Sequence, residues 1–220
     1  MKLILSLMVL MMTTIDLVQA VEWKHYNSSL LIEVKRPNGV FTCTGVAVSK
    51  EIILTAAHCL DGKVESVRIF VQDHYDPQQD SLAIKEYKIH PLYNPETSRY
   101  KADLAKINLK APLPEEIKIH PIYKGKKISG NLLRFGFGER KKQNIRTVAT
   151  PMLRNLNIEE EVIELNDEFS KSGDSGGPIF MQKGDEISLL AIHSTFSFGP
   201  EGNYSLNPFL SAYVPWIFND

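Results

Sequence analysis

The sequence predicts an all-β protein, a barrel or a sandwich, and two patterns support this fold class. Short apolar runs recur along the whole chain, and turn-forming residues separate them. In some runs polar and apolar residues alternate, as in KEYKI at 85–89, which is the two-residue period of a half-buried strand. Helical periodicity is scarce in comparison. Many short strands with little helix are typical of β-barrels and β-sandwiches.

The predicted strands fall into an earlier and a later group along the chain. The earlier group is 40–48, 52–56, 67–71, 82–90 and 104–109, and the later group is 132–137, 179–181 and 187–193. Between them, residues 109–124 hold Pro112, Pro114 and Pro121 and few strand-forming residues, as a connection between two halves would. We place the halves at about 21–115 and about 125–214.

The first twenty residues are typical of an export signal. Lys2 precedes an apolar run at 3–12, and Val18 and Ala20 occupy the small-residue positions of a cleavage site. The alternative is a transmembrane anchor, but the run is far shorter than the ~20 residues that span a bilayer. We therefore expect cleavage after Ala20, a mature domain at 21–220 with no membrane association, and a secreted or periplasmic protein.

Composition argues against several partners. The formal net charge is −1, and no basic stretch is interleaved with aromatic residues. Neither nucleic acid nor an anionic membrane is an expected partner, and we expect a monomer without a cofactor. Asp73, Asp76 and Asp80 share one loop, but an ordinary solvated turn explains them, so we predict no metal site.

Three short motifs carry candidate chemistry. They are TAAHC at 55–59, ADLAKI at 102–107 and GDSGGP at 173–178, which present His58, Asp103 and Ser175. A serine hydroxyl is a weak nucleophile and needs an adjacent base. Histidine titrates near neutral pH and suits that role, and a carboxylate can orient it. The three residues are therefore candidates for one catalytic site.

These motifs together resemble the trypsin- and chymotrypsin-like serine proteases, peptidase family S1. The resemblance runs from about Cys43 to Ile217 and includes HPLYN at 90–94, GFG at 136–138 and YVPWI at 213–217. It implies two six-stranded antiparallel β-barrels, an active site in the cleft between them and a short C-terminal helix. It also implies a serine endopeptidase that acts on peptide or protein substrates through His58, Asp103 and Ser175 and an acyl-enzyme.

The two cysteines, Cys43 and Cys59, are expected to pair. Export permits a disulfide, their even number leaves no free thiol, and two thiols are too few for a zinc site. In the family that the sequence resembles, a disulfide of this spacing ends immediately after the catalytic histidine.

The resemblance also assigns roles around the nucleophile. The N–H groups of Gly173 and Ser175 would form the oxyanion hole, where each donor contributes ~3 kcal/mol. Asp174 would pair with an N-terminal ammonium, and we expect Val21, exposed by leader cleavage, to provide it. The alternative is that another group pairs with Asp174, as in branches of the family that dispense with the N-terminal pairing.

The substrate-binding residues implied by the resemblance are Phe169, Ser170, Ser194, Thr195 and Phe196. Ser194 would also bind Asp103, and a substrate backbone would add as a strand along 194–196. Phe169 stands where trypsin has an aspartate, so cleavage after Arg or Lys is not expected. Phe196 stands where the family usually has a glycine at the pocket wall. Other groups that could reach this pocket are Asp167, Glu168, Gly199 and Gly202.

Two other functions remain open from the sequence. One is a catalytically silent, protease-fold binding protein whose pocket is occluded by Phe169 or Phe196. The other is an esterase or acyl transferase of a different fold, although the order His–Asp–Ser differs from the Ser–Asp–His order of α/β-hydrolases.

Overall fold

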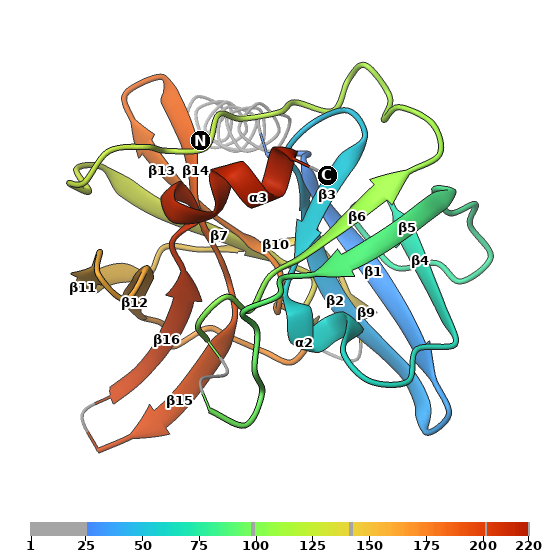
Figure 1. Cartoon of the computed structure of the whole chain (residues 1–220), viewed down its shortest axis with the longest axis horizontal. Helices are drawn as coiled ribbons and strands as arrows, with labels where there is room; N and C mark the ends of the chain where they lie inside the picture. Colours follow the sequence, from blue (N-terminus) through green and yellow to red (C-terminus); the bar gives the residue numbers. More distant parts are fainter. Residues whose placement is uncertain (1–25, 98–99, 141–142, 201, 220) are drawn as a thin grey trace, which may run out of the picture.

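The first half of the chain forms one six-stranded antiparallel sheet (Figure 1). The computed structural model describes residues 26–97, 100–140, 143–200 and 202–219, so the expected leader and Val21 lie outside the described residues. The sheet has the strand order β4-β1-β2-β3-β6-β5. Its strands are β1 (Ser29–Arg36), β2 (Gly39–Ala47), β3 (Ile52–Thr55), β4 (Ser66–Phe70), β5 (Ile84–Ile89) and β6 (Ala105–Leu109).

The second half contains two four-stranded sheets, ordered β10-β7-β13-β14 and β11-β12-β16-β15. A two-stranded ribbon, β8 (Glu139–Arg140) with β9 (Gln143–Asn144), accompanies them. The other strands are β7 (Asn131–Gly136), β10 (Thr147–Ala149), β11 (Met152–Asn157), β12 (Val162–Asn166), β13 (Pro178–Lys183), β14 (Glu186–Ile192), β15 (Thr195–Gly199) and β16 (Gly202–Pro208). All their pairings are antiparallel.

The described helices are short. The helix α2 (Ala57–Leu60) follows β3 at the junction of the two halves, and the 3₁₀ turn η1 (Leu210–Tyr213) leads into the C-terminal α3 (Val214–Phe218) (Figure 1). Within the described residues, no helix has the length and apolar character needed to cross a membrane. The predicted all-β class is confirmed, with sheets consistent with a trypsin-like double barrel and a short C-terminal helix.

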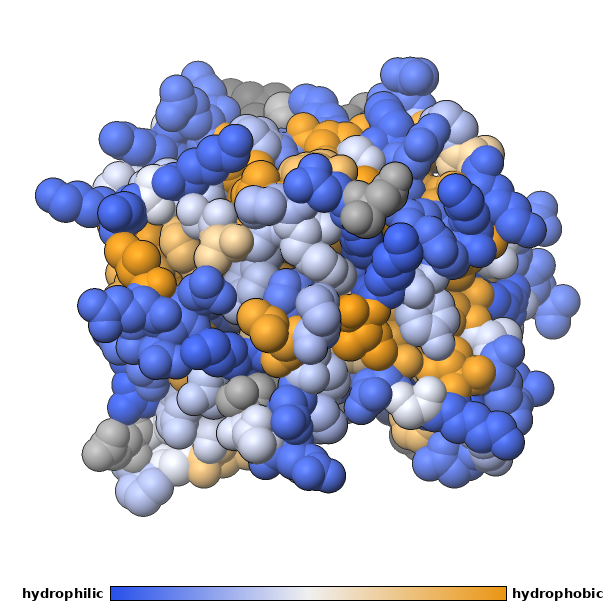
Figure 2. Space-filling view, in the orientation of Figure 1, coloured by the Kyte–Doolittle hydropathy of each residue, from blue (hydrophilic) through white to orange (hydrophobic). Residues whose placement is uncertain are grey.

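One apolar cluster joins the two halves. It brings Leu54 and Leu104 from the first sheet against Phe135 and Phe180 from the second half, and Ile217 of α3 packs into it. Separate clusters fill each half. Elsewhere hydrophobic residues reach the surface in separate patches among hydrophilic ones (Figure 2). Because burial of apolar surface drives folding, the shared cluster fixes how the halves face each other.

Lys106 of β6 ties the C-terminal helix to the first half. Its side chain is 3% exposed, and Nζ donates to the carbonyl oxygens of Trp216 at 3.0 Å and Asn219 at 2.5 Å. The ammonium also lies 5.3 Å from the centre of the Trp216 ring. A cation at the C-terminal end of a helix is favourable because the last carbonyls lack helical partners. The charge thus compensates the carbonyl groups at the end of α3.

Replacing Lys106 with methionine is therefore expected to lower the free energy of unfolding by about 2 kcal/mol, because it removes a charged donor from partly buried carbonyl groups. Urea titration at neutral pH measures the change. The matched control is Lys110→Met, since Lys110 is exposed at the end of the same strand and its replacement should stay within about 0.5 kcal/mol. Equal effects of the two substitutions would contradict the role assigned to Lys106.

Candidate active site

The His58 imidazole is held by a buried carboxylate. His58 lies on α2, where its backbone N–H donates to Asp103 Oδ1 at 2.9 Å and its Nδ1 lies 2.7 Å from Asp103 Oδ2. The Asp103 side chain is 0% exposed, whereas that of His58 is 36% exposed. Because a carboxylate only accepts hydrogen bonds, Nδ1 carries the proton. Nε2 is therefore the nitrogen that can accept a proton from another group.

Asp103 is in turn positioned by two contacts with the second half of the chain. Ser194, which follows β14, donates from Oγ to Asp103 Oδ2 at 2.5 Å. On the other side, Ala102 takes a left-handed φ of 53°, and its N–H donates to the Tyr213 hydroxyl at 3.2 Å. A non-glycine residue in this region is strained and persists only where its surroundings enforce it. The backbone is thus bent to direct the carboxylate at His58.

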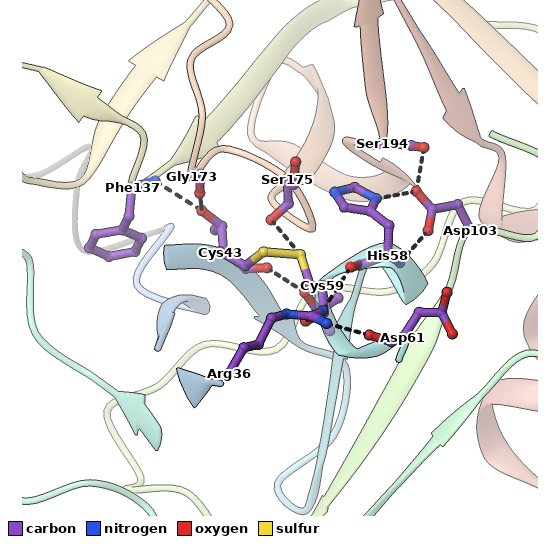
Figure 3. Close-up of a disulfide and its surroundings, with 12 residues drawn as sticks. Arg36, Cys43, His58, Cys59, Asp61, Asp103, Phe137, Gly173, Ser175 and Ser194 are labelled. Atoms are coloured by element: carbon purple, nitrogen blue, oxygen red, sulfur yellow. Dashed lines mark hydrogen bonds and ion pairs between the residues drawn. A yellow bond between two sulfur atoms is a disulfide. The ribbon is translucent and has the colours of Figure 1, made fainter. Parts of the chain in front are cut away.

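Ser175 lies in a glycine-rich loop between β12 and β13, and the loop is fastened to β2. Thr44 donates from its N–H to the Ser175 carbonyl at 2.7 Å and from Oγ1 to the Gly173 carbonyl at 2.8 Å. Gly173 and Gly176 have φ values of +101° and +84°, which favour glycine. A Cβ on Gly176 would lie 2.1 Å from the Thr44 carbonyl oxygen. In Figure 3 the His58 ring lies between Asp103 and Ser175.

The disulfide and an arginine brace the segment that carries His58. Cys43 of β2 is bonded to Cys59 of α2, with their Cα atoms 6.4 Å apart (Figure 3). Arg36 of β1 donates to the carbonyl groups of Asp61 at 2.6 Å and Cys59 at 3.0 Å. The expected pairing of the cysteines is present, and Arg36 is a brace that the sequence analysis missed.

A cavity of about 550 Å³ opens beside Ser175 on the disulfide side. Its walls include Arg36, Phe41, His58 and Gly173. This cavity is lined by none of the residues expected to bind substrate, which are Phe169, Ser170, Ser194, Thr195 and Phe196. A larger hollow of about 610 Å³, bordered by Tyr26, Phe135 and Met152, contains none of the triad residues.

The expected substrate-binding residues fall into two environments. Phe169 and Phe196 are 60% and 39% exposed, and Phe196 with Thr195 lies on β15 at a sheet edge. Ser170, in contrast, is buried and donates from Oγ to Asp167 Oδ2 at 2.8 Å.

Glu168, Gly199 and Gly202, which the sequence also suggested for the substrate pocket, lie in different places. Glu168 is exposed. Gly199 and Gly202 pair with each other where β15 meets β16, at the end of that hairpin.

Asp174 and Asp167 share a buried arginine. Arg134 of β7 is 1% exposed; its Nη1 lies 3.0 Å from Asp174 Oδ2 and its Nε lies 2.8 Å from Asp167 Oδ2. Burial raises the pKa of Asp167, but Arg134, His193 and Ser170 together lower it below its ordinary value. The sequence analysis missed Arg134. The available signal was a lone arginine inside the apolar run at 132–137.

His193 completes this buried network. Its Nδ1 lies 3.1 Å from Asn207 Oδ1, and that oxygen also accepts the Ser194 N–H, so Nδ1 is the protonated nitrogen. Its Nε2 lies 3.1 Å from Ser170 Oγ. Burial, together with the nearby Arg134 charge, lowers the pKa of His193 to about 4, although Asp167 and Asp174 act in the opposite direction.

Among the described residues, no group of three or more His, Cys, Asp or Glu side chains is arranged to hold a metal ion. In the loop of Asp73, Asp76 and Asp80, Asp73 forms an ion pair with Arg146, with Oδ1 lying 2.5 Å from Nη1. The His58–Asp103–Ser175 arrangement by itself can support acyl transfer, in which the hydroxyl attacks and the imidazole accepts its proton.

The lowered pKa of His193 predicts an acid-side loss of stability. Between about pH 6.5 and about pH 4 the unfolded chain protonates this histidine and the folded chain does not. The free energy of unfolding should therefore fall as the pH falls through this range. Urea titrations over this pH range should show that the free energy of unfolding falls less steeply for His193→Gln than for the unsubstituted protein. The exposed His74, changed to glutamine, is the control, and a slope unaltered by His193→Gln would contradict the assignment.

Comparison with known proteins identifies the family of the chain. The family model described as Trypsin matches residues 18–217. CLIP domain-containing serine protease B4 of Anopheles gambiae is 25% identical over 240 residues, which covers 85% of this chain and 64% of that protein. Phenoloxidase-activating factor 3 of Holotrichia diomphalia is 25% identical over 222 residues, covering 80% and 63%. The chain thus spans less than two thirds of the length of these relatives.

A solved structure shares the fold. The crystal structure of scabies mite inactivated protease paralogue S-I1 matches with a TM-score of 0.69 and 21% identity, over 88% of this chain and 93% of that one. Together with the family match over residues 18–217, this shows that the chain belongs to the trypsin family (S1) of serine proteases.

Proposed function

We propose that the chain is an exported serine endopeptidase that cleaves peptide bonds through an acyl-enzyme on Ser175. The observation that carries this proposal is the buried Asp103 carboxylate, 2.7 Å from His58 Nδ1 and 2.5 Å from Ser194 Oγ. Such a carboxylate holds the imidazole in the tautomer whose Nε2 accepts a proton, and it stabilises the imidazolium that forms during attack.

In the proposed reaction Ser175 Oγ attacks the scissile carbonyl carbon while His58 Nε2 takes the hydroxyl proton. The N–H groups of Gly173 and Ser175 donate to the developing oxyanion, and His58 then returns the proton to the leaving amine. Water, deprotonated by His58, hydrolyses the acyl-enzyme. In this proposal the leaving-group side of the substrate binds in the cavity lined by Gly173 and the disulfide.

On the acyl side, substrate backbone adds to the edge strand β15. An edge strand offers free backbone groups, and extended peptides bind to such edges. Phe196 and Phe198 of β15 are exposed and contact each other edge to face, with their ring centres 5.2 Å apart. They present an apolar surface to the side chains of a peptide on this edge. This surface favours apolar substrate residues near the scissile bond.

The proposal is tested by incubating the protein with a diverse peptide pool and mapping the products by mass spectrometry. Ser175→Ala is expected to lower turnover by roughly six orders of magnitude, whereas Ser66→Ala, an exposed serine on β4, should leave the cleavage pattern intact. A fluorophosphonate probe provides a second readout of Ser175 reactivity. Labelling without peptide cleavage would indicate ester chemistry. Neither labelling nor cleavage would support the catalytically silent alternative and reject the proposal.

A further inference from the structure

Two asparagines stand in the sequence Asn-X-Ser, where X is any residue except proline. They occur in NSS at 27–29 and in NYS at 203–205. An asparagine in this setting is an acceptor for N-linked glycosylation in a secreted protein, and it needs a surface position. The surroundings of Asn27 and Asn203 in the folded chain therefore decide which of them can carry a glycan.

The amide of Asn27 binds the connection between the two halves through both of its polar atoms. Nδ2 donates to the carbonyl oxygen of Glu116 at 2.7 Å, and Oδ1 accepts the N–H of Lys118 at 2.9 Å. A sugar on Nδ2 would lie against the backbone of residues 116–118. Asn27 is therefore the less suitable acceptor of the two.

Asn203 has a side chain that the fold leaves available. It is the second residue of β16, close to the end of the hairpin with β15, and it is partly exposed. Its backbone is engaged, since its carbonyl oxygen accepts the N–H of Asp167 at 3.0 Å. Within the described residues, its side-chain amide has no hydrogen-bond partner. A bulky group on Nδ2 therefore breaks no contact of the strand.

An exposed aromatic ring lies directly opposite Asn203. Phe198 of β15 is the cross-strand partner of Asn203, and paired residues of an antiparallel ladder have their side chains on the same face of the sheet. Phe198 is 70% exposed, although one edge-to-face contact joins its ring to Phe196. The end of the hairpin projects from the body of the second half (Figure 1). The ring thus offers an apolar platform beside the acceptor amide.

The ring of a sugar matches this platform chemically. One face of a pyranose presents C–H groups while its hydroxyl groups point outward around the rim, so the sugar has an apolar face. Packing that face on the Phe198 ring removes apolar surface of both partners from water, which is favourable. This packing would cover a ring that the fold leaves exposed.

We propose that Asn203 is an N-glycan acceptor and that the first sugar of its glycan, N-acetylglucosamine, packs on the Phe198 ring. The donor is an oligosaccharide linked to a membrane lipid through a diphosphate. Asn203 Nδ2 loses a proton and forms a bond to the anomeric carbon, while the bond from that carbon to the diphosphate oxygen breaks and the lipid diphosphate leaves with the electron pair. The inference rests on the export included in the proposed function, and it adds a modification beside the substrate edge β15.

The sugar is attached before the second half folds. The acceptor sequence includes the hydroxyl of its third residue, which is here Ser205. In the folded chain Ser205 is 0% exposed, and its Oγ accepts a hydrogen bond from Asn207 Nδ2 at 2.9 Å. A transferase can therefore read this sequence only in the extended chain, while the Asn203 amide stays at the surface afterwards and tolerates the glycan.

The first experiment produces the full 220-residue chain in eukaryotic cells that secrete it. Glycans are released with an amidase in heavy-oxygen water, which labels each asparagine that carried one, and the labelled peptides are mapped by mass spectrometry. Label is expected at Asn203. Asn203→Gln should remove the mass of the glycan from the secreted protein, whereas the matched control Asn27→Gln should keep it. A secreted protein without label at Asn203, or with label at Asn27 alone, would overturn the proposal.

Export and peptide cleavage are scored separately from the glycan. A chain that stays in the cell rejects the export part of the proposed function, and residues 21–220 are then secreted behind an established leader for the same mapping. A secreted chain that carries the glycan at Asn203 but cleaves no peptide supports the acceptor site and rejects the protease.

A second experiment tests the contact between the sugar and the ring. Trimming the glycan to its first sugar should leave Tm unchanged, because that sugar makes the contact, whereas complete removal should lower Tm by about 2–4 °C. In Phe198→Ser the effect of complete removal should fall below about 1 °C. The control Phe218→Ser, which changes an exposed ring on α3, should retain the full effect. Equal effects of glycan removal in both variants would show that the sugar does not pack on Phe198.

Discussion

The carboxylate of Asp103 is the group on which the arrangement of the two halves depends. It is fully buried and charged, and a buried charge without partners would cost several kcal/mol. Its partners come from both halves, since His58 follows β3 in the first half and Ser194 follows β14 in the second. The carboxylate is satisfied only when the halves are correctly docked. The same docking orients the His58 imidazole, so folding and chemistry share one constraint.

A second connection across the junction positions the serine. Thr44 of β2 holds the carbonyl groups of Gly173 and Ser175, and the absence of a Cβ at Gly176 lets the loop approach that strand. The disulfide places Cys59 beside this contact, because Cys43 precedes Thr44 on β2. The positions of His58 and Ser175 are therefore both fixed by contacts with β2 of the first sheet. This explains how residues far apart in sequence keep a fixed relation.

The sequence predicted several strands from their apolar runs and missed others. Runs such as 104–109 and 187–193 correspond to β6 and β14. The strand β16 was missed because it buries Ser205 and Asn207, which hides the alternation. The strands β1 and β12 were missed although each buries several apolar residues. The triad was predictable because each member lies in a distinctive local motif. Arg134 was not, since its partners lie more than thirty residues away and only the folded sheet brings them together.

The buried network behind Ser175 shows why such groups occur in a core that apolar residues could fill more cheaply. Two carboxylates face one guanidinium, and His193 is neutral at ordinary pH, so the network keeps a net negative charge that hydrogen bonds from backbone N–H groups must offset. The Ser170 hydroxyl has one proton and two acceptors, Asp167 Oδ2 and His193 Nε2. The proton can serve one of these acceptors at a time, but directional contacts of this kind restrict the core to fewer conformations than apolar packing does. In the proposed function the loop presents two N–H groups to a single oxyanion, and geometric definition of the loop is the property that this role requires.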